Sequence, residues 1–288
     1  MSERVVLVCG AGLMGHGIAQ VMAAAGHRAL LYEPELARAE QGRARIGSNL
    51  QRALAKGRIS AAERHAQLER VVVAPRLAEA AATADLVVEA VYEDEKVKLE
   101  LFAELDATAP RRTVLASNTS SISITRLASA TSAQRRPRVV GMHFFSPVPV
   151  MPLIELVRGA ETDDATEGVV RDIAAELGKQ VIVSRDRPGF IVNRVLMPLL
   201  AEAMRAYEEG LATAEDIDVG AKVGLRHPMG PLELADFIGL DVCLQIMEVL
   251  HDGFGAPHFA PPPVLRQLVD AGHLGQKSGR GFYRYPRD

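Results

Sequence analysis

The sequence is short of the features that would place a protein outside the cell or in a membrane. Its 288 residues include only two cysteines, too few for a disulfide framework, and no apolar run approaches the roughly 20 residues of a membrane span. Neither charge dominates, since 33 Lys and Arg stand against 36 Asp and Glu, so nothing favours nucleic acid or a membrane surface as a partner. An apolar segment begins at Val5, which leaves no room for a signal peptide. We therefore expect a cytoplasmic protein, and we expect no metal site.

The chain does contain a strand followed by a glycine-rich turn at its very start. Val5–Cys9 is continuously apolar, as in a strand that is buried on both faces of a parallel sheet. The next residues, Gly10-Ala11-Gly12-Leu13-Met14-Gly15, fit the G-x-G-x-x-G dinucleotide fingerprint. In that fingerprint the first Gly makes a tight turn, the second lets the backbone approach a pyrophosphate, and the third lets a helix pack closely on the strand. Apolar residues at helical spacing follow, so the turn opens a helix as the fingerprint requires.

An acidic residue at the end of the next apolar run indicates which dinucleotide is bound. Ala29–Tyr32 reads as the second strand, and Glu33 follows it where a carboxylate accepts the ribose hydroxyls. A carboxylate there would repel a 2′-phosphate, so Glu33 favours NAD over NADP as the cofactor. The alternative is a glycine-rich turn in an unrelated α/β protein, which would not need this acid.

The remaining pattern predicts two domains. Strands expected at 71–73, 86–91, 113–116, 139–145, 153–157 and 181–183 alternate with helices, which indicates an α/β fold with a Rossmann-like, doubly wound, mostly parallel sheet. Strand signals then fade, and long helices are expected at 190–209 and 232–250. We predict a NAD-binding domain over residues 1–186 and a smaller all-helical domain over residues 187–288.

Polar side chains follow several of these strands. Ligands bind beyond the carboxyl ends of parallel strands, so Glu93 and the cluster Ser117–Ser121 should lie around the same crevice as Gly12. Serines there could equally cap the helix expected near Ile122. A basic ridge, defined as Arg38, Arg45, Arg52 and Lys56, should occupy one face of the helix that follows Glu33; it could be an ordinary solvated face.

Two further strands each carry a titratable residue in an apolar setting. His143 lies in the run 139–145 and Glu155 in the run 153–157, with a short proline-rich loop between them. A Glu in such a run is costly unless it is paired. They could be a satisfied core His and an edge-strand Glu. If the strands instead bring them together, the carboxylate fixes the tautomer and raises the basicity of the His, as a general base needs.

These motifs together resemble the 3-hydroxyacyl-CoA dehydrogenase family, in particular its short bacterial form. The resemblance is carried by GAGLMGHGIA at 10–19, SNTSS at 117–121, HFFSPVPVM at 143–151, PGFIVNR at 188–194, HPMGP at 227–231 and the terminal KSGRGFY at 277–283. The motifs span almost the whole chain in order. No hydratase-like segment accompanies them, so the multifunctional fatty-acid oxidation protein is excluded.

The resemblance implies roles for individual residues. His143 would be the base that takes the hydroxyl proton, Glu155 would orient it, and Ser120 and Asn193 would hydrogen-bond to the substrate oxygen. Glu93, Lys98, Ser146 and Lys277 match cofactor-side positions, together with Gly10, Gly12, Leu13, Met14, Gly15 and Glu33. Lys56 matches a position that meets the CoA nucleotide, which gives Arg45 and Arg52 a reason to be basic. Two residues depart from the family, Ser146 where Asn is usual and Glu33 where Asp is common.

The implied activity is interconversion of (S)-3-hydroxyacyl-CoA and 3-oxoacyl-CoA with NAD, on short chains such as 3-hydroxybutyryl-CoA and acetoacetyl-CoA. One alternative is a β-hydroxyacid dehydrogenase on a free acid, which would use a catalytic Lys rather than a His143–Glu155 pair. Another is a non-catalytic NAD-binding structural protein, like the lens crystallins related to this family. We also expect a homodimer through the helical domain, whose helices carry more apolar surface than about 100 residues usually bury alone.

Overall fold

The computed structural model describes residues 3–286. Contacts within the chain divide it into two compact units, Met1–Arg187 and Pro188–Asp288. Each unit has its own apolar core.

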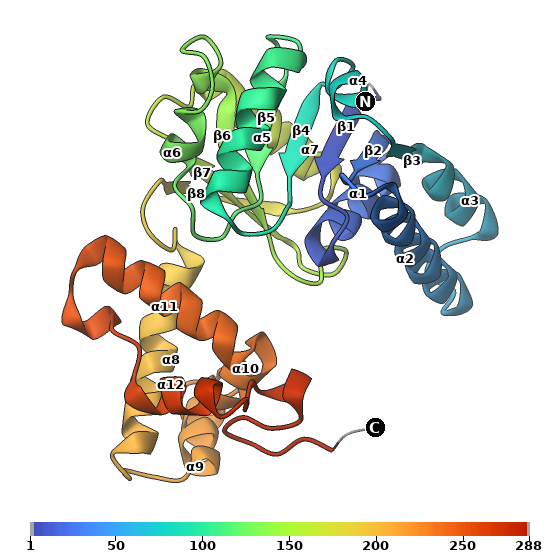
Figure 1. The fold of residues 1–288 in the computed structure, drawn as a ribbon. Helices are drawn as coiled ribbons and strands as arrows, with labels where there is room; N and C mark the ends of the chain where they lie inside the picture. The colour runs from blue at the N-terminus through green and yellow to red at the C-terminus, as the bar shows by residue number, and fades with distance from the viewer. Residues whose placement is uncertain (1–2, 287–288) are drawn as a thin grey trace. The chain divides into compact units, whose positions relative to one another are not determined.

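The N-terminal unit is built on one eight-stranded sheet with the strand order β3-β2-β1-β4-β5-β6-β7-β8 (Figure 1). Neighbouring strands run parallel except for β6 and β7, which are antiparallel. This confirms the Rossmann-like, mostly parallel sheet predicted from the sequence. The strands are β1 (Val5–Cys9), β2 (Arg28–Tyr32), β3 (Val71–Ala74), β4 (Leu86–Glu89), β5 (Val114–Ser117), β6 (Val139–Phe144), β7 (Leu153–Arg158) and β8 (Gln180–Arg185).

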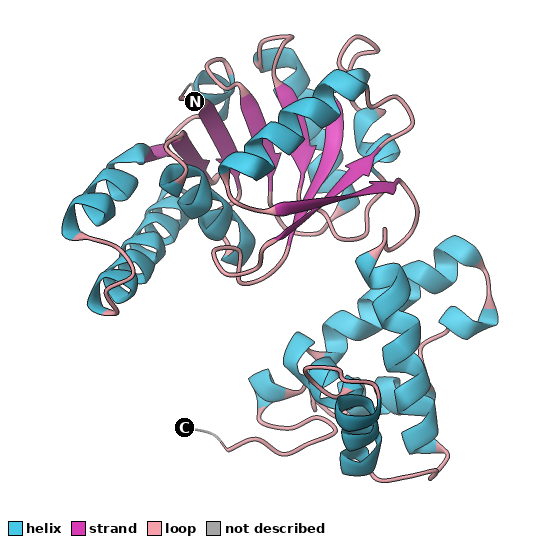
Figure 2. Ribbon diagram, turned by 180° about the vertical axis from the view of Figure 1, so that it is seen from behind, coloured by secondary structure: helices cyan, strands magenta, loops and turns pink. Residues whose placement is uncertain are grey.

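Helices pack against both faces of this sheet, with α5 in front of it and α7 behind it in Figure 1 (Figures 1 and 2). Burial on both faces explains why β1 and the first three residues of β4 are apolar without alternation. The helices are α1 (Leu13–Ala24), α2 (Leu36–Ala55), α3 (Ala61–Arg70), α4 (Leu77–Ala81), α5 (Glu95–Thr108), α6 (Ile124–Ala128) and α7 (Asp164–Glu176), with a 3₁₀ turn η1 (Arg136–Arg138).

The strand order reverses at β1, which lies between β2 and β4. Such a switch point is where open α/β sheets bind ligands, beyond the carboxyl ends of the strands. The register aligns these ends in one row: Cys9 lies opposite Glu89, Glu89 opposite Ser117, and Ser117 opposite Gly141. The segments that follow β1, β4 and β5 therefore start from neighbouring points.

The antiparallel pair at the other side of the sheet brings the two titratable strand residues together. His143 on β6 is the register partner of Glu155 on β7. The alternative of an edge-strand Glu is wrong, because β8 pairs along the outer side of β7 and Glu155 is fully buried. A buried carboxylate in a central strand needs a partner, and the register supplies one.

The C-terminal unit is helical in the part of the chain that the structure describes. Its core is formed mainly by apolar side chains of α8, α10 and α11. The elements are α8 (Val192–Glu208), α9 (Ala214–Val219), a π-helical turn η2 (Gly220–Gly224), α10 (Pro231–Ile238), α11 (Leu240–Phe254), a 3₁₀ turn η3 (Pro257–Phe259), α12 (Pro263–Asp270) and a 3₁₀ turn η4 (Gln276–Ser278).

The single helix predicted over residues 232–250 is wrong, because Gly239 divides it into α10 and α11. Gly239 has a φ of 106°, which an L-residue adopts only with strain, so the helix cannot continue through it.

Two buried carboxylates in this unit hold the C-terminal segment in place. Asp218 accepts a hydrogen bond from the Tyr283 hydroxyl at 2.8 Å, and Asp236 accepts from the Tyr283 amide at 2.9 Å.

Candidate active site

The glycine turn between β1 and α1 has the geometry that the fingerprint requires. Gly10 has a φ of 105°, and a Cβ at Gly10 would overlap with the carbonyl of Ala90. A Cβ at Gly15 would overlap with the Gly10 carbonyl, so α1 can approach β1 this closely only with glycine there. At Gly12, the N-cap of α1, nothing lies within 4 Å of the place of a Cβ. The open space above the helix N-terminus fits the pyrophosphate of a dinucleotide.

Glu33 lies beside this turn. One of its carboxylate oxygens accepts a hydrogen bond from the Ala11 amide at 2.7 Å, and the other lies 4.0 Å from Nε of Arg38. The carboxylate is thereby held at the end of β2, next to the space above Gly12. This is the placement that ribose recognition needs.

His143 and Glu155 form a buried pair. Nδ1 of His143 lies 3.0 Å from Oε2 of Glu155, and the His143 ring lies 4.5 Å from the Phe145 ring, centroid to centroid. The side chain of Asn118 ties the end of β6 to the loop after β5, since its Oδ1 accepts a hydrogen bond from the Phe144 amide at 2.9 Å. The pair is thus fixed by a strand register and by a neighbouring loop.

The loop Ser117–Ser121 is organised around a carboxylate. Glu93 accepts hydrogen bonds from the Ser120 amide at 3.0 Å and from the Ser121 hydroxyl at 3.1 Å. The serines of this cluster do not cap α6, because Ser123 does so by accepting from the Arg126 amide at 3.1 Å. The loop is therefore shaped by Glu93, and its serines are not needed for the helix.

Lys98, which was expected on the cofactor side, is buried beneath this loop. Its ammonium lies 2.6 Å from Oε1 of Glu89 and 3.0 Å from Oε2 of Glu93. Burial works to raise the pKa of Glu93, but the charge of Lys98 and the hydrogen bonds from Thr119, Lys98 and the Ser120 amide together hold it below its usual value. Sequence reasoning missed Glu89 because it stands inside an apolar strand; its charge was the available signal.

The other predicted residues lie in several places. Ser146 is exposed in the loop after β6. Asn193 is buried in α8, and Lys277 pairs with Asp241 at the start of α11; both belong to the helical unit. Lys56 follows α2 at the exposed C-cap, and Arg52 is exposed one turn earlier.

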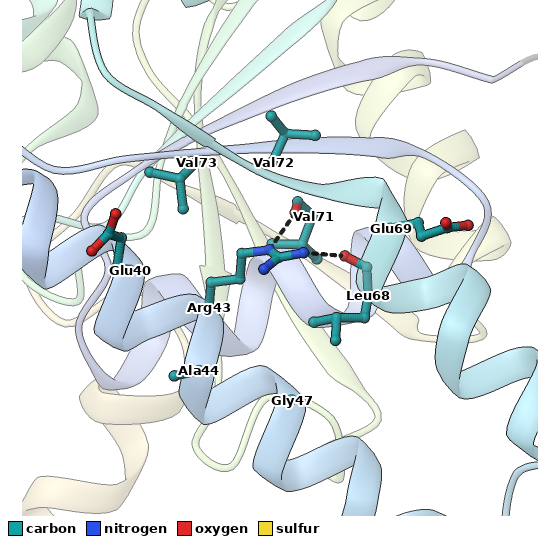
Figure 3. Close-up of a pocket in the computed structure, with 9 residues that line it drawn as sticks. All are labelled: Glu40, Arg43, Ala44, Gly47, Leu68, Glu69, Val71, Val72 and Val73. Carbon is teal, nitrogen blue, oxygen red and sulfur yellow. Dashed lines mark hydrogen bonds between the residues drawn. The ribbon is translucent and has the colours of Figure 1, made fainter.

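Two cavities border α2. One, of about 500 Å³, is lined by Arg45 and Arg52 of the basic ridge together with Leu13, His16 and the loop 147–149. It joins the ridge to the glycine turn. The other, of about 580 Å³, lies between α2, α3 and β3, where Arg43 donates hydrogen bonds to the carbonyls of Val71 and Leu68 (Figure 3). That cavity is the larger of the two, but none of the predicted site residues lines it. The smaller cavity, which Arg52 lines, is therefore the better candidate for ligand binding.

Comparisons with known proteins agree with this geometry. Residues 5–187 match the NAD binding domain of 3-hydroxyacyl-CoA dehydrogenase, and residues 189–285 match its C-terminal domain. The chain belongs to the 3-hydroxyacyl-CoA dehydrogenase family. It is therefore an NAD-dependent oxidoreductase, as the sequence motifs predicted.

Relatives within this family align over nearly the whole chain. The 3-hydroxybutyryl-CoA dehydrogenase of Bradyrhizobium diazoefficiens is 49% identical, with 96% of this chain and 94% of the relative covered. A probable 3-hydroxybutyryl-CoA dehydrogenase of Bacillus subtilis is 47% identical, with 99% and 98% covered. The crystal structure of (S)-3-hydroxybutyryl-CoA dehydrogenase PaaH1 from Ralstonia eutropha superposes with a TM-score of 0.95 at 43% identity, with 99% and 100% covered.

Residues 3–286 lack two kinds of feature. No group of three or more His, Cys, Asp or Glu side chains in this range is arranged to hold a metal ion. No helix in this range combines the length and the apolarity that crossing a bilayer takes.

Proposed function

We propose that this dehydrogenase interconverts (S)-3-hydroxybutyryl-CoA and acetoacetyl-CoA, with His143 as the general base. The observation that carries the proposal is the His143–Glu155 pair, a buried His and carboxylate 3.0 Å apart at the end of a sheet that binds a dinucleotide. A catalytic Lys on a free acid would leave this pair without a task. The names of the bacterial relatives support the short-chain substrate.

The pair defines a proton path. A carboxylate facing Nδ1 keeps the imidazole proton on that nitrogen, which directs the basic lone pair to Nε2. Nε2 then takes the proton of the substrate hydroxyl, and the negative Glu155 offsets the positive charge that develops on the ring. Bound NAD would supply the acceptor for the hydride of the substrate carbon. In the reverse direction His143 returns the proton to the forming hydroxyl.

The remaining assignments concern binding. The amides of the glycine turn and the Glu33 carboxylate would hold the pyrophosphate and the ribose, with Glu93 on the same side of the cofactor. Ser120 and Asn193 are assigned to the substrate oxygen. The basic ridge, with Lys56 and Arg52, is assigned to the phosphates of CoA. The position of Arg45 and Arg52 in the lining of the 500 Å³ cavity supports this assignment.

We also propose that the helical unit forms a homodimer. Large apolar side chains of this unit are exposed in the single chain, and association of two copies through this unit would bury them. They include Val195 (67% exposed), Leu211 (77%), Val223 (76%) and Leu225 (66%).

One assay tests the activity. NADH oxidation is followed with acetoacetyl-CoA, then with longer 3-oxoacyl-CoA esters and with acetoacetate. We expect the highest kcat/KM with acetoacetyl-CoA. Equal or faster turnover of the free acid would contradict the proposal.

A further inference from the structure

Glu89 is a buried carboxylate that none of the assignments above uses. It is the last residue of β4 and is fully buried. By register it lies between Cys9 of β1 and Ser117 of β5, in the row of strand ends that faces the site. An ionised carboxylate without solvent is costly unless its oxygens are bonded, so its partners are informative.

Both oxygens of Glu89 are engaged. Oε1 accepts hydrogen bonds from the Lys98 ammonium at 2.6 Å and from the Val91 amide at 2.8 Å. Oε2 accepts from the Ser117 hydroxyl at 2.5 Å. Two of these contacts, those with Lys98 and Ser117, lead onward toward the loop Ser117–Ser121.

The first route runs through Lys98. The same ammonium that contacts Glu89 lies 3.0 Å from Oε2 of Glu93, whose other oxygen accepts the Ser120 amide at 3.0 Å. The second route runs through Ser117, whose hydroxyl oxygen accepts the Thr119 amide at 3.1 Å while its proton is given to Glu89. Two hydrogen-bonded routes from Glu89 therefore meet at the residues around Ser120.

The distribution of charge distinguishes this arrangement from an ordinary buried ion pair. One carboxylate is enough to neutralise a buried ammonium, yet the Lys98 ammonium lies against two carboxylates, those of Glu89 and Glu93. Glu89 has no exposed side-chain surface, whereas the Glu93 side chain is 38% exposed. Glu89 thus anchors the ammonium from inside, and the ammonium presents a fixed positive charge to the half-exposed Glu93.

We propose that Glu89 is a positioning residue, which fixes the Glu93 carboxylate through Lys98 and fixes the backbone at Thr119, next to Ser120, through Ser117. This inference rests on the proposed function, because it assigns Ser120 to the substrate oxygen and Glu93 to the cofactor side. Displacement of a positioning group by about 1 Å can reduce turnover about a hundredfold without loss of folding. The effect should therefore appear in kcat.

The test uses Glu89→Gln, which keeps the shape and removes the charge. In this variant the side-chain amide oxygen can accept hydrogen bonds from Lys98 and Val91 only if the NH₂ group faces Ser117. The Ser117 hydroxyl proton must then turn away, because the NH₂ group cannot accept it. Both routes are therefore weakened. We expect kcat with acetoacetyl-CoA and NADH to fall about tenfold to a hundredfold, with KM for NADH changing less than about threefold.

The control is Thr113→Val. Thr113 directly precedes β5, at the opposite end of that strand from Ser117. Thr113 is fully buried, and its hydroxyl donates to the Ala84 carbonyl at 2.6 Å, so the substitution removes a buried hydrogen bond without touching the network. We expect a lower melting temperature with kcat unchanged. Ser117→Ala is the second variant, which breaks one route only; its kcat loss should be smaller, and it should add little to that of Glu89→Gln in the double variant.

The outcomes are distinguishable. A wild-type protein without activity on acetoacetyl-CoA contradicts the proposed function itself. An active wild type with kcat within about twofold in Glu89→Gln, or with Ser117→Ala unaffected, contradicts the positioning role alone. A fall in kcat of similar size in Thr113→Val would also overturn it, since general destabilisation would then explain the loss.

Discussion

His143 and Glu155 stand directly opposite each other on the antiparallel strands β6 and β7, with Nδ1 and Oε2 3.0 Å apart. These strands follow each other in the chain with a short connection, so the antiparallel register between them is what places the two side chains together. A slip of one residue would turn one side chain to the other face of the sheet. The chemistry proposed for this dehydrogenase depends on that register.

Replacement of Glu33 should change the preference between cofactors. Glu33→Ala removes the carboxylate that is expected to bind the ribose hydroxyls, and it leaves Arg38 without its neighbour 4.0 Å away. We expect KM for NAD to rise about tenfold, in line with one hydrogen bond to a charged group, and the preference over NADP to narrow. Steady-state kinetics with both cofactors measure this. In the double variant Glu33→Ala/Arg38→Ala, any improvement in kcat/KM with NADP over that of the wild type should disappear. A wild type that prefers NADPH would refute the cofactor assignment.

The basic ridge should discriminate between CoA and smaller thioesters. Lys56→Glu reverses an exposed charge at the end of α2, so we expect KM for acetoacetyl-CoA to rise about fivefold to tenfold through lost attraction to phosphate. The pantetheine thioester, which lacks the nucleotide, should show a weaker effect. Arg28→Glu, an exposed charge reversal at the start of β2, is the control and should leave both KM values unchanged. Equal changes in KM for both substrates in Lys56→Glu would show that the ridge is only a solvated face.

The oligomeric state tests the exposed apolar surface of the helical unit. We expect light scattering at micromolar concentration to give the mass of a dimer, about twice 31.0 kDa. Leu211→Lys and Val223→Lys place charges on side chains that are 77% and 76% exposed, and at least one should shift the protein toward monomer. A wild-type monomer under these conditions would overturn the dimer proposal.

The break at Gly239 should matter for stability. Gly239→Ala forces a residue with a Cβ to a φ of 106°, and the added atom would lie 3.0 Å from Oδ1 of Asp241 and 3.1 Å from Nζ of Lys277. We expect a loss of about 1–3 kcal/mol in the free energy of unfolding, measured by chemical denaturation. Gly220→Ala is the matched control, because Gly220 has helical torsion angles and open space; it should be neutral or stabilising. The same loss in both variants would mean that backbone strain is not the cause.

The sequence was sufficient for the parts of this protein that follow from local rules. The apolar run before Gly10 predicted β1, and the paired runs around His143 and Glu155 allowed their contact, though only the register decided it. The break at Gly239 was hidden because Ile238 and Leu240 continue the apolar pattern on either side. Glu89 was hidden for a related reason, since three apolar residues precede it in a strand and its side-chain partners lie 9 and 28 residues away in the chain. Partners at such separations are set by tertiary packing, which periodicity does not report.

The central claim is that His143 and Glu155 act as one unit. Removal of a general base typically lowers the rate about 10²–10⁴-fold, so we expect a loss of that order in His143→Gln with NAD binding retained. In Glu155→Gln the amide can hold the wrong tautomer, as an Asp→Asn change does in serine proteases, so kcat should fall more than KM rises.

A double-mutant cycle on kcat, with wild type, His143→Gln, Glu155→Gln and the double variant, tests the claim most directly. Groups that act together give losses far from additive in free energy, so the double variant should be little worse than His143→Gln alone. If the two single losses multiply in the double variant, the residues act independently and the account of the dyad is contradicted.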